Sequence, residues 1–363
     1  MSYAPEPPYK HGNAARVGVL LINLGTPAAP TAAALRRYLA EFLSDPRVVE
    51  IPRLPWWLIL HGVILRVRPA KSARKYAAIW TPDGSPLAVW TARQAKMLFG
   101  YLGQSGHGLL VRHAMRYGQP SIASEMDALR AAGATRVLVL PLYPQYSGAT
   151  SASVFDAVAA WGRRARWVPE LRFVQQYHDD PGYIAALAAQ VQSHWQREGR
   201  GRMLLMSFHG VPERTLHLGD PYHCHCQATA RLLAQRLGLA AHEYRVTFQS
   251  RFGKAKWLQP YTEPTLQQLA RDGFEHVDVI CPGFVADCLE TLEEINQEAR
   301  EAFMAAGGKT FKYIDCLNDR HEWIDALRGI ALRHLQGWPT QDGPGAAELK
   351  AQRDRALALG APD

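Results

Sequence analysis

Short apolar runs alternate with amphipathic stretches along most of the chain. The runs are about four to eight residues long, the length of a buried strand, and several end at Gly-x-Pro or Pro turns. Strands that alternate with helices indicate parallel sheets covered by helices. The predicted strands are 17–24, a strand from 109, 138–142, 171–175, 203–208, 244–249 and 277–281. The predicted helices are 31–42, 71–80, 151–161, 181–197, 228–237 and 264–271.

The order of these elements occurs twice in the chain. The strand that ends in Leu24-Gly25-Thr26-Pro27 resembles the strand that ends in His209-Gly210-Val211-Pro212. Residues 132–141 likewise resemble 272–281, because each stretch runs from a helix through a glycine into a valine-rich strand. Long-period similarity of this kind indicates an internal duplication of one α/β unit.

Four segments follow from this pattern. Residues 1–16 are Pro-rich and polar and are expected to form a flexible tail, 17–175 and 176–335 are the two halves, and 336–363 form a polar tail. The first half contains an insertion, 51–68, which is apolar, contains Trp56 and Trp57, and is flanked by arginines. This segment, called the lip below, is too short to span a bilayer. Its pattern fits a membrane interface, a wall for a flat apolar ligand, or a helix packed in the core.

Charge and cysteine content narrow the class of protein. The 363 residues carry a formal charge of +8, but they contain no long Lys/Arg block and no common nucleic-acid motif, so an anionic substrate or a membrane surface is favoured over nucleic acid. Neither a signal peptide nor a stretch of about 20 apolar residues is evident, and five cysteines do not suggest a disulfide framework, so we expect a cytoplasmic protein. Cys224 and Cys226 lie in an expected loop beside His223 and His225. Ligands this close in sequence converge poorly on one ion, so no structural zinc or iron–sulfur site is expected there.

Two stretches carry candidate chemistry. His209 follows a buried strand, where ligands bind in open α/β sheets, although backbone could equally satisfy such a histidine. Glu290 and Glu294 share a helix face at i, i+4, and Asp287 lies one turn earlier. Neighbouring acids suit a proton acceptor or a metal ligand, and the alternative is acids placed for the helix dipole. Because both stretches follow strands of the same half, His209 and Glu290 could meet in one crevice and move protons or hold a divalent ion.

Several short motifs also occur in an order known from one enzyme family. In order, they are Leu24-Gly25-Thr26-Pro27, Arg116-Tyr117-Gly118, Tyr143-Pro144-Gln145-Tyr146-Ser147, Ser207-Phe208-His209-Gly210-Val211-Pro212, Gly219-Asp220-Pro221-Tyr222, Phe248-Gln249-Ser250-Arg251, Trp257-Leu258 and Pro282-Gly283-Phe284-Val285-Ala286-Asp287-Cys288-Leu289-Glu290-Thr291-Leu292. In these motifs, residues 17–335 resemble ferrochelatase. The resemblance implies an α/β fold of two similar Rossmann-like halves, each a parallel sheet flanked by helices, with the active cleft between them.

The reaction implied by the resemblance is the insertion of Fe(II) into protoporphyrin IX to form protohaem, the terminal step of haem biosynthesis, with loss of two pyrrole protons. Iron is then a substrate, and neither a nucleotide nor a redox cofactor is implied, in agreement with the missing G-x-G-x-x-G. The resemblance gives His209 and Glu290 the catalytic and metal-binding roles, and Asp287, Glu293 and Glu294 a proton path. The expected porphyrin-binding residues are Arg68, Tyr76, Ser85, Arg116, Tyr117, Tyr143, Tyr146, Ser147 and Trp257. The lip would give peripheral contact with a membrane.

Two departures from the family pattern affect these expectations. Cys288 stands where some members carry a basic residue or histidine, and the tail after Leu335 lacks the cysteines that hold a [2Fe–2S] cluster in some members, so no such cluster is expected. The alternatives are a chelatase that acts on coproporphyrin or another tetrapyrrole or inserts another divalent metal, and a non-catalytic haem or metal carrier. A nucleotide-binding enzyme is disfavoured by the missing phosphate loop. The sequence makes no prediction of oligomeric state.

Overall fold

The structure, a computed structural model, describes residues 3–253, 255–341 and 343–362. It contains two four-stranded sheets, and every strand pair in them is parallel. The first sheet has the order β2-β1-β3-β4 and the second β6-β5-β7-β8. The bounds are β1 (Arg16–Gly25), β2 (Leu110–Tyr117), β3 (Ala134–Pro141), β4 (Glu170–Phe173), β5 (Met203–His209), β6 (Tyr244–Gln249), β7 (His276–Ile280) and β8 (Thr310–Ile314).

The two sheets confirm the predicted duplication. β1 and β5 hold the same place in their sheets, and so do β3 and β7, which are the two pairs matched in the sequence. In each sheet the direction of connection reverses beside the first strand, between β1 and β3 or between β5 and β7. Ligands bind at the carboxyl ends of strands at such a point, so the duplication gives two equivalent places for a site.

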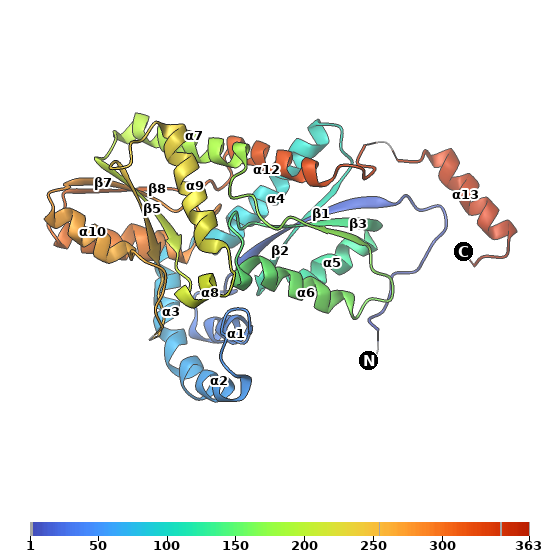
Figure 1. Cartoon of the computed structure of the whole chain (residues 1–363). Coiled ribbons are helices and arrows are strands. Elements are labelled where there is room, and N and C mark those ends of the chain that lie inside the picture. Colours follow the sequence, from blue (N-terminus) through green and yellow to red (C-terminus); the bar gives the residue numbers. More distant parts are fainter. Residues whose placement is uncertain (1–2, 254, 342, 363) are drawn as a thin grey trace.

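Helices cover both faces of each sheet (Figure 1). The outer face of the first sheet packs on α5 (Ile122–Ala131) and α6 (Ser153–Gly162). The outer face of the second packs on α10 (Thr262–Arg271), the π-helix η3 (Glu290–Ala299) and α11 (Arg300–Ala305). The remaining helices are α1 (Ala32–Leu43), α2 (Arg53–Ile59), η1 (Leu60–Ile64), α3 (Leu65–Ile79), α4 (Pro86–Gln104), η2 (Gly148–Ala152), α7 (Pro181–Glu198), α8 (Glu213–His217), α9 (Tyr222–Leu237), α12 (His321–His334) and α13 (Ala346–Ala358).

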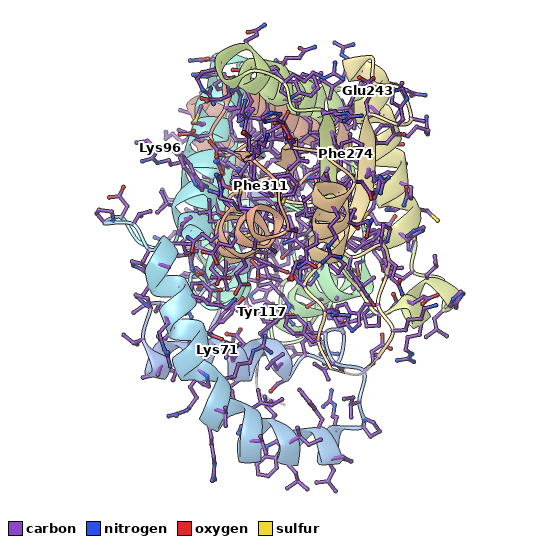
Figure 2. All side chains as sticks on the ribbon, turned by 90° about the vertical axis from the view of Figure 1, so that its left-hand side faces the viewer. Lys71, Lys96, Tyr117, Glu243, Phe274 and Phe311 are labelled. Carbon is purple, nitrogen blue, oxygen red and sulfur yellow. The ribbon has the colours of Figure 1, made fainter. Side chains whose placement is uncertain are left out.

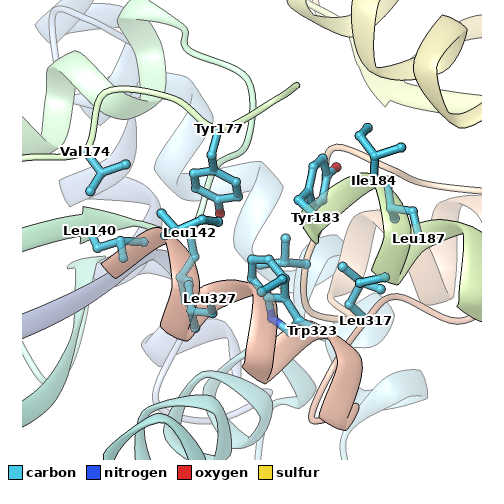
Figure 3. Close-up of a cluster of buried hydrophobic side chains, with 14 of the residues drawn as sticks. Leu140, Leu142, Val174, Tyr177, Tyr183, Ile184, Leu187, Leu317, Trp323 and Leu327 are labelled. Carbon is cyan, nitrogen blue, oxygen red and sulfur yellow. The ribbon is translucent and has the colours of Figure 1, made fainter. Parts of the chain in front are cut away.

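One hydrophobic core joins the two halves. Side chains alternate along each strand, so Val19 of β1 and Met206 of β5 face this shared core, while Leu20 and Leu205 face the outer helices. Helices α4, α7, α9 and α12 fill the shared core. At its centre the fully buried Trp323 contacts the rings of Tyr177 and Tyr183 (Figure 3). This packing fixes the two sheets relative to each other.

The predicted lip is the tip of a helical arm. Helices α1, α2, η1 and α3 project together away from the sheets (Figure 1), and Figure 2 shows the arm, marked by Lys71, below the rest of the molecule. The arm packs through a small core that includes Tyr117 at the end of β2 and Leu289 just before η3. The arm therefore meets both halves near the strand ends that carry the candidate residues. Within the described ranges, no helix has the length and apolar character needed to cross a membrane.

Some local predictions were wrong. The helix expected at 71–80 begins at Leu65 and continues the lip without a break. The Cys224 and Cys226 segment, expected to be a loop, lies inside α9, which begins at Tyr222 directly after a turn in which Asp220 accepts a hydrogen bond from the Tyr222 main-chain nitrogen.

Candidate active site

His209 is the last residue of β5 and is partly buried. Its Nδ1 lies 2.6 Å from the carbonyl oxygen of Gly210. A carbonyl can only accept, so Nδ1 carries the hydrogen and Nε2 of the neutral ring keeps a free lone pair. A side chain at Gly210 would lie 2.7 Å from the main-chain oxygen of Gln249, so glycine permits this close approach. The local geometry therefore presents His209 Nε2 as a base or a metal ligand.

The acids of η3 lie beside this histidine. Gln249, which pairs in register with His209, donates a hydrogen bond from Nε2 to the main-chain oxygen of Glu290 at 2.7 Å. Ser250 donates a hydrogen bond from Oγ to Glu294. Burial raises the pKa of Glu294, the Ser250 hydrogen bond and the field of His209 lower it, and the negative charge of Glu290 raises it. His209, Glu290 and Glu294 thus form one electrostatically linked group.

Three side chains of the arm face Glu290 from the first half. Burial raises the pKa of Tyr76, and the Glu290 carboxylate raises it further. Burial lowers the pKa of Arg68, while Glu290 opposes that shift. Burial likewise raises the pKa of Tyr38, to which Tyr76 and Glu290 add. The structure therefore brings the predicted residues Arg68 and Tyr76 near Glu290. It also places Tyr38, which the sequence did not predict, in the same group.

Ser85 joins this group indirectly. Its Oγ accepts a hydrogen bond from Thr26 Oγ1 at 2.7 Å, at the carboxyl end of β1. Thr26 in turn forms a hydrogen bond that lowers the pKa of Tyr76. Ser85 is buried, so the structure places it behind Tyr76.

Arg116 and Tyr117 lie in a buried network around Asp45. Asp45 Oδ2 accepts hydrogen bonds from Arg116 at 2.6 Å, from Tyr117 at 2.8 Å and from Ser153 at 2.5 Å. These bonds outweigh the burial of Asp45, so its pKa lies below the usual value. Tyr117 is fully buried. The network holds the segment after α1 against β2 and α6, and it does not bring Arg116 or Tyr117 to His209.

Tyr143 lies near this network. Its pKa is raised by burial and by nearby Tyr117 and Tyr38. Its hydroxyl is buried and has no hydrogen-bond partner among the described residues. A buried hydroxyl without a partner is costly, so this donor is available for a ligand.

Three further predicted residues occupy different places. Trp257 pairs with Pro212 and lies 3.3 Å from the position a Cβ would take at Gly210, so it flanks the His209 turn. Tyr146 and Ser147 lie farther along, where Ser147 Oγ donates to Asp220 at 3.2 Å and the main-chain nitrogen of Tyr146 donates to the ring of His225. The structure thus associates Trp257, but not Tyr146 and Ser147, with His209.

Asp287 and Glu293 are held by neighbours. Asp287 is buried and accepts hydrogen bonds from Thr291 at 2.9 Å, Tyr313 at 2.5 Å and Asn318 at 2.6 Å, so it anchors the start of η3. Glu293 forms an ion pair with Lys75 at 2.9 Å. Of the three acids predicted for a proton path, Glu294 is the one whose pKa responds to His209.

Sequence reasoning missed several residues of this site. Gln249 and Ser250 belong to one of the family-like motifs, but the sequence assigned them no function. The sequence did not point to Tyr38 or Lys75, because each falls in an ordinary helical pattern.

The structure has two surface hollows away from these residues. One, of about 510 Å³, lies between α9 and β6, and the other, of about 420 Å³, lies between α7 and α12; neither is lined by His209 or Glu290. Within the described part of the chain, no group of three or more His, Cys, Asp or Glu side chains is placed so that it could hold a metal ion.

Comparisons with known proteins agree with this architecture. The family model described as Ferrochelatase matches residues 16–335. A protein named Ferrochelatase from Methylibium petroleiphilum is 70% identical over 361 residues, covering 99% of each chain. A second, from a Polaromonas species, is 66% identical over 366 residues and covers 100% of each.

Solved structures share the fold at low sequence identity. SirB from Bacillus subtilis with Fe3+ is 11% identical with a TM-score of 0.51, covering 90% of this chain and 100% of that one. DR2241 from Deinococcus radiodurans is 13% identical with a TM-score of 0.51, covering 94% of this chain and 60% of that one. The strand order, the repeat and the family match lead to one conclusion: the chain belongs to the ferrochelatase family.

Proposed function

We propose that the protein inserts Fe(II) into protoporphyrin IX, releases the two pyrrole protons and forms protohaem, the terminal step of haem biosynthesis. Relatives named Ferrochelatase are similar to this chain over 99% and 100% of its length. The observation that carries the proposal is the grouping of His209, with a free Nε2, beside Glu290 and the partly buried Glu294. A base next to a carboxyl group whose pKa is raised suits a reaction that releases protons.

The proposed chemistry assigns a step to each member of this group. His209 Nε2 accepts a pyrrole proton, because a neutral imidazole is basic near pH 7. Glu294, whose pKa is raised by burial, accepts that proton and passes it outward along η3. Before that proton transfer, Glu290 and His209 Nε2 together hold Fe(II) transiently, since Fe(II) accepts both carboxylate and imidazole, and the Nε2 lone pair becomes free for the proton when the ion moves to the ring. Two ligands bind weakly, which allows the ion to leave for the ring.

The arm and the turn after β5 would hold the macrocycle. Arg68 and Tyr76 lie opposite Glu290 and can meet the propionates or the ring edge, and Trp257 can stack beside His209. Metal entry requires the ring to pucker, so a site that favours the puckered ring lowers the barrier. Tyr143 supplies an unused donor near the arm. Tyr146 and Ser147 would bound the far edge of the ring.

In this proposal, three of the expected porphyrin-binding residues do not contact the ring but position other residues: Arg116, Tyr117 and Ser85. Arg116 and Tyr117 hold Asp45 in the segment after α1, and Ser85 supports Tyr76 through Thr26. Asp287 fixes the start of η3 through three hydrogen bonds. We propose that the protein needs no resident cofactor, neither a nucleotide nor a [2Fe–2S] cluster, and that iron is its substrate.

The lip would place the protein on the cytoplasmic surface of a membrane. Its large exposed apolar side chains are Ile51, Leu54, Trp57, Leu58, Ile59, Val63 and Val67. Trp57 is 56% exposed, whereas Trp56 is turned inward and donates a hydrogen bond from Nε1 to the carbonyl oxygen of Leu43 at 2.6 Å. An apolar tip of this kind, with Arg53 and Arg66 beside it, suits contact with acyl chains and phosphates. A site near a membrane would take up an apolar porphyrin without passage through water.

The test is an insertion assay with the purified full chain. Fe(II) and Co(II) are supplied with protoporphyrin, coproporphyrin or sirohydrochlorin, and metallation is followed by absorbance. The proposal expects the highest kcat/KM for Fe(II) with protoporphyrin. A preference for coproporphyrin or sirohydrochlorin would assign a related chelatase instead. Tight retention of haem without turnover would identify a carrier.

A further inference from the structure

Lys75 links the arm to the helix that carries the acids. Its Nζ lies 2.9 Å from Glu293 Oε1 and 2.7 Å from Glu298 Oε1. Lys75 belongs to α3 of the first half and both acids to η3 of the second, more than 200 residues away, with separations of 218 and 223. The ion pairs therefore join two halves of the molecule beside the candidate site.

The ion pair between Lys75 and Glu293 is partly withdrawn from solvent, whereas the Glu298 side chain is 52% exposed. The Lys75 side chain is 29% exposed and that of Glu293 10%. The pair between Lys309 and Glu275, at 2.7 Å, has exposures of 64% and 47%. Water screens charges less at the first pair than at the second, so the Lys75 ammonium has the larger effect on its acids.

The four glutamates of η3 fall into two sets. The Glu294 carboxylate accepts a hydrogen bond from Ser250 on the His209 side, and the main-chain oxygen of Glu290 accepts one from Gln249 there. Glu293 and Glu298 turn toward α3 and bind Lys75. The first set is left without a directly paired lysine or arginine among the described ion pairs, and the second has an ammonium between its carboxylates.

We infer that Lys75 is a positioning residue that occupies Glu293 and Glu298 and so leaves Glu290 and Glu294 as the carboxylates of η3 that receive the metal ion. This inference rests on the proposed function. Four closely spaced carboxylates attract a divalent cation at more than one place, and an ion held at the outer pair would be lost to the reaction. The ammonium neutralises the outer pair.

The test measures binding of Mn²⁺ alone to the full chain, by the loss of the free-ion signal in electron paramagnetic resonance. The variants are Lys75→Met, Lys75→Arg and the double variant Lys75→Met with Glu293→Gln. Lys309→Met is the matched control, because it removes the same charge from an exposed ion pair. We expect Lys75→Met to bind Mn²⁺ roughly tenfold more tightly, or to gain a site, while Lys75→Arg and the double variant bind like the parent chain. Equal affinity in Lys75→Met and the parent, or an equal gain in Lys309→Met, would overturn the inference.

Insertion kinetics give a second readout. Excess Co(II) should inhibit Lys75→Met at a lower concentration than the parent, with kcat at low metal concentration little changed, and Lys75→Arg should restore the parent profile. Loss of kcat without a change in metal inhibition would assign Lys75 a merely structural role. Mn²⁺ binding needs no turnover, so the binding result stands even if the chain inserts no metal and the proposed function fails. Urea unfolding of each variant confirms that it is folded.

Discussion

The side-chain amide of Gln249 donates a hydrogen bond to the main-chain carbonyl oxygen of Glu290 at 2.7 Å. Gln249 lies opposite His209 in the β5–β6 register, so this bond ties the histidine-bearing edge of the sheet to the first residue of η3. Gln249 Oε1 also accepts a hydrogen bond from Ser207 at 2.8 Å. One buried amide therefore sets the position of the imidazole relative to the carboxylate.

Replacing Gln249 should separate these two groups. Gln249→Ala leaves the Glu290 carbonyl and the Ser207 hydroxyl short of partners, at a cost of about 1–3 kcal/mol in the free energy of unfolding. Insertion should fall by roughly 10- to 100-fold, as for other residues that orient a metal ligand. Urea unfolding and the insertion assay measure the two effects. An unchanged rate in a folded variant would show that Gln249 does not position Glu290.

Glu290→Gln should slow insertion by about 100-fold or more, because the amide neither accepts a proton nor binds Fe(II) as a carboxylate does. Porphyrin binding, followed by quenching of tryptophan fluorescence, should persist. Glu243→Gln is the control, since Glu243 pairs with Arg200 on an exposed surface. A near-normal rate in Glu290→Gln would remove Glu290 from the site.

Two stacked histidines make stability depend on pH. The rings of His178 and His225 lie 3.8 Å apart at an angle of 9°. Burial and the neighbouring His178 lower the pKa of His225 to about 4, although Asp179 and Asp220 oppose this, and burial lowers the pKa of His178. A histidine with a lowered folded-state pKa stabilises the fold above its unfolded-state pKa, near 6.5, and this stability is lost as the pH falls toward the folded value.

We therefore expect the unfolding midpoint of the parent chain to drop between about pH 6.5 and pH 4. In His225→Gln, the free energy of unfolding should fall by roughly 1 kcal/mol less over this pH range than in the parent chain, a figure that allows for the partial exposure of the ring. Urea unfolding at a series of pH values measures it. The same pH slope in the variant and the parent would show that the pair does not titrate as described.

The lip should bind vesicles through its outward side chains. Replacing Trp57 and Leu58 with serine removes exposed apolar area, and vesicle affinity should fall by roughly tenfold or more. Trp56→Phe should lower stability instead, because Trp56 donates a hydrogen bond to the Leu43 carbonyl and packs in the arm. Flotation with anionic vesicles separates the two effects. Equal flotation of the Trp57 and Leu58 variant and the parent would contradict membrane contact through the lip.

Sequence patterns predicted the architecture because buried parallel strands are continuous apolar runs, and the duplication marked the equivalent positions of β1 and β5. They placed His209 at a strand end for the same reason. They did not predict that η3 is π-helical, because the spacing of Glu290 and Glu294 also fits an α-helix. They could not separate Trp56 from Trp57, or show that Tyr117 is buried, because tertiary contacts decide which side of the arm faces its neighbours. The role of Gln249 likewise depends on a partner 41 residues away.

The most direct test of the account is single-turnover insertion of Fe(II) into bound protoporphyrin by His209→Ala. Porphyrin is first bound to saturation, which tryptophan quenching confirms, and metallation is then timed after iron is added. The account predicts that porphyrin binds as in the parent chain while insertion is abolished, because Nε2 of His209 is the proton acceptor. Insertion at close to the parent rate would contradict it.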